Sequence, residues 1–560
     1  DATAYPCAHA DHSQRDCAIM QPADLIIYNA HVFTANDAQP DAEAVVVRGN
    51  KIAFVGQNAD ALAFRGPQTR VVDGNGHSLL PGFIDTHFHL AWGSQKLDGV
   101  QLAGVATMAE LATAVHAWLA ENPNADWVAG YGLSYGLPTP DEPLTRYHLD
   151  QIVHDRPFVL YTYDVHSLFA NSAALQQANI LHGAPRPLAN GTVVVGADGL
   201  ATGELYEEDA TRLMRRVMPE PDEAATLRLI QKGLALAAAH GLTSVHNMDG
   251  DLAQGKLYAT LEEQNALTLR LLLPYWVKPK TPLAEMQAQT RQMRQSFSSD
   301  KLRAGGVKFF MDGVYESYTA VTLDAYPDQP HNFGEPIWDA STFAKFATTA
   351  DALGLQIAVH ACGNGAVRRV LDGYEAAQRV NGRRDSRHRV EHIEMVHPAD
   401  LPRFAQLGVI AAMQPRHAPD SATSEDVWPQ RIAPGNWQHA FAWQTVRQAG
   451  ATLVFGSDWP VVSLNPLLGI AAAVNRQPWQ PNDPSQAQTL ADAICSYTRD
   501  AAYAEFQETR KGQLQPGFLA DLVLLSDNIF AIPPQEIGQL AVALTVCDGT
   551  VIYEKEESEK

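Results

Sequence analysis

Apolar and polar residues follow two different patterns along the chain. In residues 23–80, and again in residues 511–560, they alternate over short runs separated by turns such as Asp73-Gly74-Asn75-Gly76. This alternation is typical of short antiparallel strands that bury one face. We therefore predict a small β-sandwich domain assembled from both terminal regions, with residues 1–22 as a separate polar leader.

Residues 81–510 contain eight short apolar runs separated by helical patterns, two of which end at Gly241 and Gly354. Buried runs that alternate with helices predict parallel strands in βα units. Eight such strands close a barrel, so the predicted fold class is α/β, a (β/α)8 TIM barrel that carries the terminal β-sandwich. The eight runs are 82–89, 242–248, 268–276, 306–313, 355–363, 389–395, 408–415 and 453–460.

The connection between the first and second runs is abnormal in length. It covers residues 93–216, far more than an ordinary βα connection needs. Loops that follow barrel strands lie at the catalytic face. We therefore predict a large insertion after the first barrel strand, folded as a lid subdomain over the site.

The overall charge narrows the class of partner. The formal net charge is −22, whereas binding to nucleic acid or an anionic membrane needs clustered Lys and Arg. No apolar run reaches about 18 residues, so no membrane insertion is expected. We predict a small-molecule substrate and no nucleic-acid partner, and a homodimer remains an open alternative.

The cysteines bear on the cellular compartment. Cys7 and Cys17 stand in the polar leader, where their spacing permits a small disulfide loop. The polar leader also resembles the N-terminus that remains after a signal peptide is removed. Together with the possible disulfide, it predicts a periplasmic or secreted protein; a cytoplasmic protein with two free thiols is the alternative. We expect Cys362, Cys495 and Cys547 to be buried thiols.

Residues that bind metal ions stand where the predicted barrel strands end. The first strand ends in His87-Phe88-His89, and the strand period of two turns both imidazoles to the same side. Imidazole and carboxylate groups are ligands of zinc and similar ions, and manganese, iron and cobalt accept such mixed sites too. This convergence predicts a metal site at the C-terminal rim. The other members of the set are Lys308, His360, His392 and Asp458.

Aromatic residues follow the ends of three strands. Trp92, Trp276, Tyr315 and Tyr318 occupy these positions, and Glu316 lies between the two tyrosines. We expect these five residues to line a substrate pocket, with core packing as the alternative for the aromatic rings and a solvated loop position for the carboxylate.

Several segments also resemble one known family. PGFIDTHFH is similar to the His-x-His motif of the amidohydrolase superfamily, and GVKFFMDG, AVHACGNGAV, RVEHIEMVHPADL, GVIAAMQP and FGSDWPV resemble its family 3 branch, which includes hydrolases similar to N-substituted formamide deformylase. The resemblance implies a centre of two divalent metal ions, with zinc as the first expectation. It assigns His87, His89 and Asp458 to the first ion, His360 and His392 to the second, and a carbamate on Lys308 as the bridge. A structural strand lysine paired with Asp312 is the alternative for Lys308.

The resemblance also implies the reaction. A metal-activated hydroxide would cleave a linear amide or related non-peptide C–N bond of a hydrophobic or aromatic substrate. Asp458 would be both ligand and general base. His166, within the insertion, would donate a hydrogen bond to the oxyanion or the substrate, with packing inside the lid as the alternative. Gly363-Asn364 departs from the Gly-Asp of the family pattern, which weakens any transfer of substrate identity.

Two alternatives to this function remain open. The first is a mononuclear metal-dependent deaminase on the same barrel, which would use one ion and no bridging lysine. The second is an exported binding protein that keeps the fold without turnover. Lys308 discriminates between the first alternative and the binuclear hydrolase, because only the hydrolase needs it as a bridge.

Overall fold

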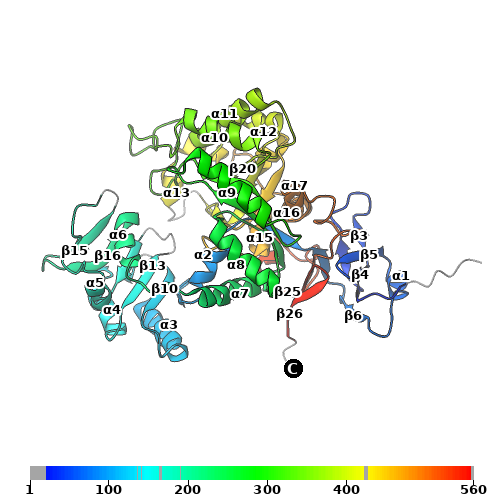
Figure 1. Ribbon diagram of the computed structural model, residues 1–560, viewed down its shortest axis with the longest axis horizontal. Coiled ribbons are helices and arrows are strands. Elements are labelled where there is room, and N and C mark those ends of the chain that lie inside the picture. The colour runs from blue at the N-terminus through cyan, green and yellow to red at the C-terminus, as the bar shows by residue number, and fades with distance from the viewer. Residues whose placement is uncertain are drawn as a thin grey trace, which may run out of the picture.

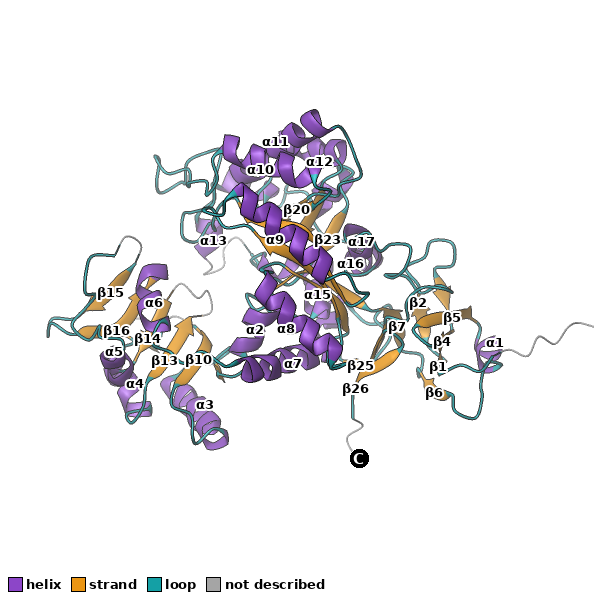
Figure 2. Ribbon diagram, in the orientation of Figure 1, coloured by secondary structure: helices purple, strands orange, loops and turns teal. Residues whose placement is uncertain are grey.

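The computed structural model describes residues 21–134, 136–139, 142–162, 167–188, 191–421 and 427–556. Its centre is a barrel of eight parallel strands surrounded by helices (Figures 1 and 2). The strands neighbour one another in the predicted order, so the predicted fold class is confirmed. They are β8 (Phe83–Phe88), β17 (Leu242–Asn247), β18 (Arg270–Trp276), β19 (Leu302–Phe310), β20 (Gln356–Ala361), β21 (Arg389–His392), β22 (Ile410–Met413) and β23 (Leu453–Phe455).

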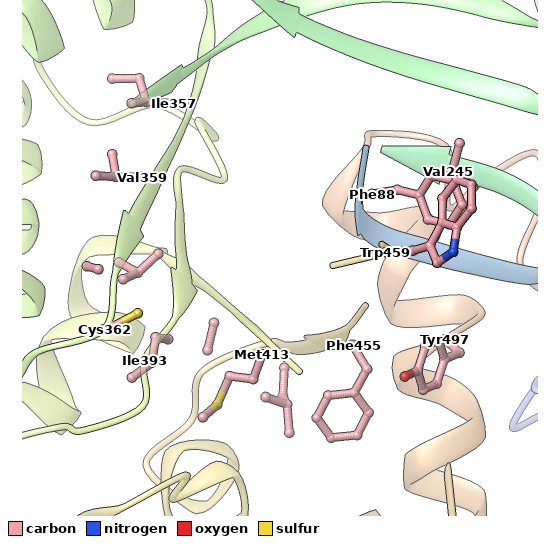
Figure 3. Packing of buried hydrophobic residues seen from close by; sticks show 14 of the residues in the cluster. Phe88, Val245, Ile357, Val359, Cys362, Ile393, Met413, Phe455, Trp459 and Tyr497 are labelled. Atoms are coloured by element: carbon pink, nitrogen blue, oxygen red, sulfur yellow. The ribbon is translucent and has the colours of Figure 1, made fainter. Parts of the chain in front are cut away.

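The barrel closes between its first and last strands. The backbone N–H of Asp458 donates to the carbonyl oxygen of His87 at 2.7 Å, and that of His89 donates to Trp459 at 3.0 Å. Beside these bonds the ring of Phe88 stacks on Trp459 with centroids 5.0 Å apart (Figure 3). Barrel closure therefore holds three of the predicted ligands next to one another through the backbone.

The surrounding helices bury one apolar face against the strands. In α11 (Asn364–Asn381) the buried residues Val367, Val370, Leu371 and Tyr374 recur at the spacing of one helix face. Gly241 and Gly354 have φ of 79° and 70° and end two helices in the left-handed conformation, as predicted. The other main helices are α2 (Leu90–Lys96), α7 (Glu223–Ala239), α8 (Leu252–Glu263), α9 (Leu283–Ser296), α10 (Ala340–Ala352), α12 (Leu401–Leu407), α14 (Trp443–Gln448), α15 (Pro466–Asn475), α16 (Leu490–Ser496) and α17 (Arg499–Ala504).

The terminal regions form two sheets that share one apolar core. Strand β7 (Ser78–Pro81) pairs with β24 (Leu522–Leu525), which joins the N-terminal and C-terminal regions just before the chain enters β8. Val45 and Leu544 belong to the same buried cluster, although they lie in different sheets. The sheets consist of β5 (Lys51–Gly56), β4 (Ala44–Arg48), β1 (Leu25–Tyr28) and β6 (Arg70–Asp73), and of β26 (Thr550–Glu554), β25 (Val542–Cys547), β24, β7, β2 (His31–Phe33) and β3 (Asp41–Ala42).

The insertion after β8 has its own sheet and its own cores. On β13 (Phe158–Thr162), Phe158 and Leu160 belong to one buried cluster and Val159 to another, because alternate residues face opposite sides of a strand. The insertion and the terminal sheet formed by β5, β4, β1 and β6 lie on opposite sides of the barrel (Figure 1). Its further main elements are β9 (Val100–Gln101), α3 (Met108–Glu121), β10 (Val128–Leu133), α4 (Arg146–Ile152), β14 (Ser167–Ala170), α5 (Ser172–Gln177), β15 (Thr192–Val195), β16 (Ala201–Tyr206) and α6 (Glu207–Arg215).

Cys362, Cys495 and Cys547 are buried free thiols, as expected. The predicted disulfide between Cys7 and Cys17 lies outside the described residues. Within the described part of the chain, no helix combines the length and apolar character needed to cross a membrane.

Candidate metal centre

The predicted ligands of the first metal meet at the rim where the barrel closes. The Nε2 atom of His89 lies 3.0 Å from Oδ1 of Asp458, and Nε2 of His87 lies 3.5 Å from the same oxygen. The ring of His392 approaches that of His87 to 4.7 Å between centroids. Ligand atoms of His87, His392 and Asp458 all fall within 4.8 Å of one another, a spacing that one metal ion can bridge.

The imidazoles of His87 and His392 are each held at Nδ1 by a hydrogen-bond acceptor, Glu391 at 2.7 Å and Gln414 at 2.9 Å. This arrangement is characteristic of metal-binding histidines, because it orients the ring and leaves the other nitrogen for the ion. The other two rings differ. Nδ1 of His89 approaches Asp249 at 3.3 Å without a hydrogen bond, and Nε2 of His360 contacts the carbonyl oxygen of Gly313 at 3.1 Å.

The protonation states also suit a metal centre. Burial lowers the pKa of His87 and of His392 well below the usual range, and it lowers that of His360 to about 4. Burial alone would raise the pKa of Asp458, but the hydrogen bond with His89 and the neighbouring imidazoles hold it below its ordinary value. His89 differs: burial disfavours its charge, yet its two carboxylate partners raise its pKa to about 9. A bound ion would have to displace that proton.

Lys308 is fully buried between these groups. Its Nζ lies 3.1 Å from Nε2 of His87 and 4.7 Å from the ring centroid of Phe310, and none of the described carboxylates comes within 4.0 Å. Asp312, the partner that a purely structural lysine would have, instead accepts backbone hydrogen bonds. Burial lowers the pKa of Lys308 to about 8, which favours the neutral amine that can react with CO2.

His360 stands slightly apart from the first group. Its ring lies 4.3 Å from that of His392, but its Nε2 faces Sγ of Cys362 at 3.4 Å and Oδ1 of Asp312 at 3.8 Å. Ligand atoms of His360, Cys362 and Asp312 form a second buried group within 4.8 Å. The predicted ligands of the second metal thus divide between two neighbouring groups.

The backbone is strained at these ligands. His392 and Asp458 have φ of 74° and 62°, and the β-branched Ile393 has φ of 49°. Such conformations are uncommon for residues other than glycine and cluster at functional sites. At His392 the turn also matters geometrically, because strict strand alternation would point it away from the side that its neighbour Glu391 faces.

A cavity of about 1410 Å³ opens over the two groups. The barrel contributes the metal-binding residues and aromatic walls, and the insertion contributes Ser167, Tyr206, Glu207 and Arg215. Substrate would therefore be enclosed by both parts of the chain.

Sequence comparison assigns this arrangement to a family. A model described as the amidohydrolase family matches residues 70–553. The chain belongs to the amidohydrolase family. It is therefore a metal-dependent hydrolase of carbon–nitrogen bonds other than peptide bonds, and the suspected resemblance is confirmed.

Relatives of this amidohydrolase match it over nearly its whole length. Protein LONG AFTER FAR-RED 3 of Arabidopsis thaliana is 31% identical, with 95% of this chain and 92% of the relative covered. N-substituted formamide deformylase of Arthrobacter pascens is 28% identical, with 96% and 99% covered. The crystal structure of an uncharacterized metal-dependent hydrolase from Pyrococcus furiosus is 25% identical, with a TM-score of 0.72 and 91% and 99% covered.

The residues predicted to contact substrate occupy different places in the amidohydrolase. Trp92, Trp276 and Glu316 line the cavity. Tyr315 is buried behind its wall, with its ring 5.3 Å from that of Trp428. Tyr318 packs under the guanidinium of Arg431 and donates a hydrogen bond to Asp328. His166 lies outside the described residues.

Two further polar residues at the rim were not predicted. Asp249 follows β17 and contacts His89, while His417 follows β22 with its Nε2 3.8 Å from Oδ2 of Asp458. The ring of His417 also stacks on that of His392 at 5.9 Å. The signal was available, since the barrel rule applies to every strand end, including β17 and β22, for which no ligand was predicted.

Proposed function

We propose that this amidohydrolase cleaves a linear amide, or a related non-peptide C–N bond, of a hydrophobic or aromatic N-acyl substrate at a binuclear metal centre. The observation that carries the proposal is Lys308, a buried amine that lies among the ligands and has no carboxylate partner in the described part of the chain. An amine in this position is explained if it becomes a carbamate, whose two anionic oxygens can bridge two cations.

The donor set fits two divalent ions. His87, His89 and Asp458 would hold the first ion, and His360 and His392 the second, with the carbamate of Lys308 between them. Zinc suits these nitrogen and oxygen ligands best, and manganese, iron and cobalt suit them as well. The bound ions would activate a water molecule and polarise the substrate carbonyl.

The chain supplies the proton transfers and the substrate position. Asp458 is deprotonated at neutral pH, so it can accept the proton of the attacking water and return it to the leaving nitrogen. His89 orients Oδ1 of this carboxylate at 3.0 Å. Trp92 and Trp276 offer flat apolar walls for the acyl or amine group.

The substrate class has support outside the structure. The relative from Arthrobacter pascens is a deformylase of N-substituted formamides and matches nearly the full chain. Because Gly363-Asn364 departs from the family pattern close to His360, the acyl group of the substrate is the part for which we expect the two proteins to differ.

A mononuclear deaminase on the same barrel is favoured by one observation. His87, His392 and Asp458 alone form a complete three-ligand group, from which His360 is separate. Such an enzyme would bind one ion and would not need Lys308.

Metal content and substrate preference test the two functions together. Protein purified without chelator and with bicarbonate should contain about two ions per chain by plasma mass spectrometry, and Lys308→Met should contain one or none. The wild type should hydrolyse some members of a panel of N-formyl, N-acetyl and aromatic N-acyl amines. One ion in both proteins, with ammonia released from amino-heterocycles, would replace the proposal by the deaminase.

A further inference from the structure

Behind His87 lies a buried ion pair that the proposed reaction does not use. Glu391 and Arg389, both on β21, are wholly inaccessible to solvent. The guanidinium of Arg389 binds both carboxylate oxygens of Glu391, through Nε to Oε1 at 2.8 Å and Nη2 to Oε2 at 2.9 Å. Oε2 also contacts Nδ1 of His87 at 2.7 Å. Three donors therefore converge on one carboxylate.

Arg389 is itself fixed from two further directions. Its Nη2 donates to the carbonyl oxygen of Thr86 at 2.6 Å, and its Nη1 lies 2.7 Å from Nδ1 of His246. Thr86 immediately precedes His87, and β8 and β21 are not neighbours in the barrel sheet. The guanidinium thus connects two strands across the barrel interior and aims the carboxylate at His87.

These contacts decide which nitrogen of His87 carries the proton. The other described hydrogen bonds of Glu391 come from the guanidinium of Arg389, which keeps the carboxylate ionised. An ionised carboxylate only accepts hydrogen bonds, so the hydrogen in its contact with His87 must be on Nδ1. The opposite nitrogen, Nε2, then offers its lone pair on the side of Lys308 and Asp458. A ring with the other tautomer would turn an N–H toward the ion.

We propose that Arg389 and Glu391 act as a positioning pair that sets the tautomer and orientation of His87 and thereby the affinity of the centre for metal. This inference rests on the metal centre proposed above. Carboxylates in this position commonly change metal affinity by about 10 to 100-fold, although neither residue touches the ion, the substrate or the reacting atoms.

Glu391→Gln is the direct test. The amide replaces one acceptor oxygen by a donor, so it must oppose Arg389 or His87 whichever way it is turned. We expect zinc affinity, measured by competition with a chromophoric chelator, to fall by about 10 to 100-fold. An affinity within about twofold of the wild type would overturn the proposal.

Asp521→Asn is the matched control. Asp521 is also buried and binds a guanidinium through both carboxylate oxygens, at 2.8 Å from Nε and 3.1 Å from Nη2 of Arg270, but none of its described contacts reaches Arg389, Glu391 or a proposed ligand. Its variant should lose stability and keep its zinc affinity. If both variants lose affinity equally, the effect is general damage to the core and the inference is wrong.

A spectroscopic measurement covers the case in which Glu391→Gln does not fold. In metal-free wild-type protein with ¹⁵N-labelled histidine, the ring shifts of His87, assigned with a His87→Gln variant, should report the proton on Nδ1. A proton on Nε2 would refute the positioning role. This reading is independent of the proposed function, which fails instead if the wild type binds no metal at all.

Discussion

Two buried lysines inside the same barrel have opposite surroundings. Lys511 lies at the N-terminal end of β17, where its Nζ contacts Glu505 at 2.6 Å and Ser244 at 2.5 Å. Lys308 lies near the C-terminal end of β19 and has an imidazole nitrogen and an aromatic ring as its nearest partners. Burial lowers the pKa of both amines.

The different partners of the two lysines indicate different roles. A buried amine that is paired with a carboxylate repays part of its desolvation cost, and removing one partner leaves the other charge stranded. An unpaired buried amine gains no such attraction, so its burial lowers the stability of the folded protein unless another group binds it. Under the proposed function, Lys511 stabilises the fold and Lys308 serves the reaction, and their different partners support this division.

The largest expected effect is the loss of activity in Lys308→Met. In the proposed binuclear centre Lys308 is the bridge between the two ions, so kcat/KM should fall by about 10⁴-fold when it is lost. The free energy of unfolding of the metal-free protein should not decrease, because the variant removes an unpaired buried amine. Amide hydrolysis and chemical denaturation measure the two quantities. A variant that retains activity would show that Lys308 is structural.

Lys511→Met should give the reverse result. It removes one of the two cations paired with the buried Glu505 and leaves Arg303, so the free energy of unfolding should fall by about 2 kcal/mol. For the fraction that remains folded, kcat/KM should stay within about threefold of the wild type, since Lys511 is remote from the cavity. A large loss of activity in stable Lys511→Met protein would mean that the two ends of the barrel are coupled.

The sequence could locate the barrel because strand period and helix spacing are local properties. All eight strands follow from them, as does the place of His87, His392 and Asp458 at strand ends, whereas the left-handed turns at His392 and Asp458 do not. The orientation of side chains in the loops is set by distant contacts instead. Tyr315 follows a strand end as predicted, yet the loop turns its ring into the core against Trp428. From the sequence, Glu391 is only one residue of a predicted buried strand. Its contact with His87 could not be predicted, because the two residues are 304 positions apart.

The cavity offers a third test of intermediate size. Trp276→Ala should raise KM for an aromatic amide by about tenfold relative to a small formamide, because the larger substrate loses an apolar wall. Phe310 packs against Trp276 with ring centroids 5.7 Å apart. Because Phe310 is still present in the variant, we expect the metal centre to keep its geometry. Steady-state kinetics on both substrates provide the comparison, and equal changes in the two KM values would remove Trp276 from the substrate site.

The smallest expected effect is the loss of folding stability at acid pH that comes from Glu505, the carboxylate partner of Lys511. Burial alone would raise the pKa of Glu505, but Lys511, His246 and Arg303 hold it below the usual 4.5. A carboxylate with a lowered pKa contributes stability that is present above its unfolded pKa and is lost as the pH falls below it. Wild-type stability should therefore decline from about pH 4.5 downward, by roughly 1 kcal/mol more than that of Glu505→Gln. Denaturation curves between pH 6 and pH 3 measure this difference. Parallel curves for the two proteins would mean that Glu505 contributes no pH-dependent stability and that the pairing of Lys511 is weaker than its geometry indicates.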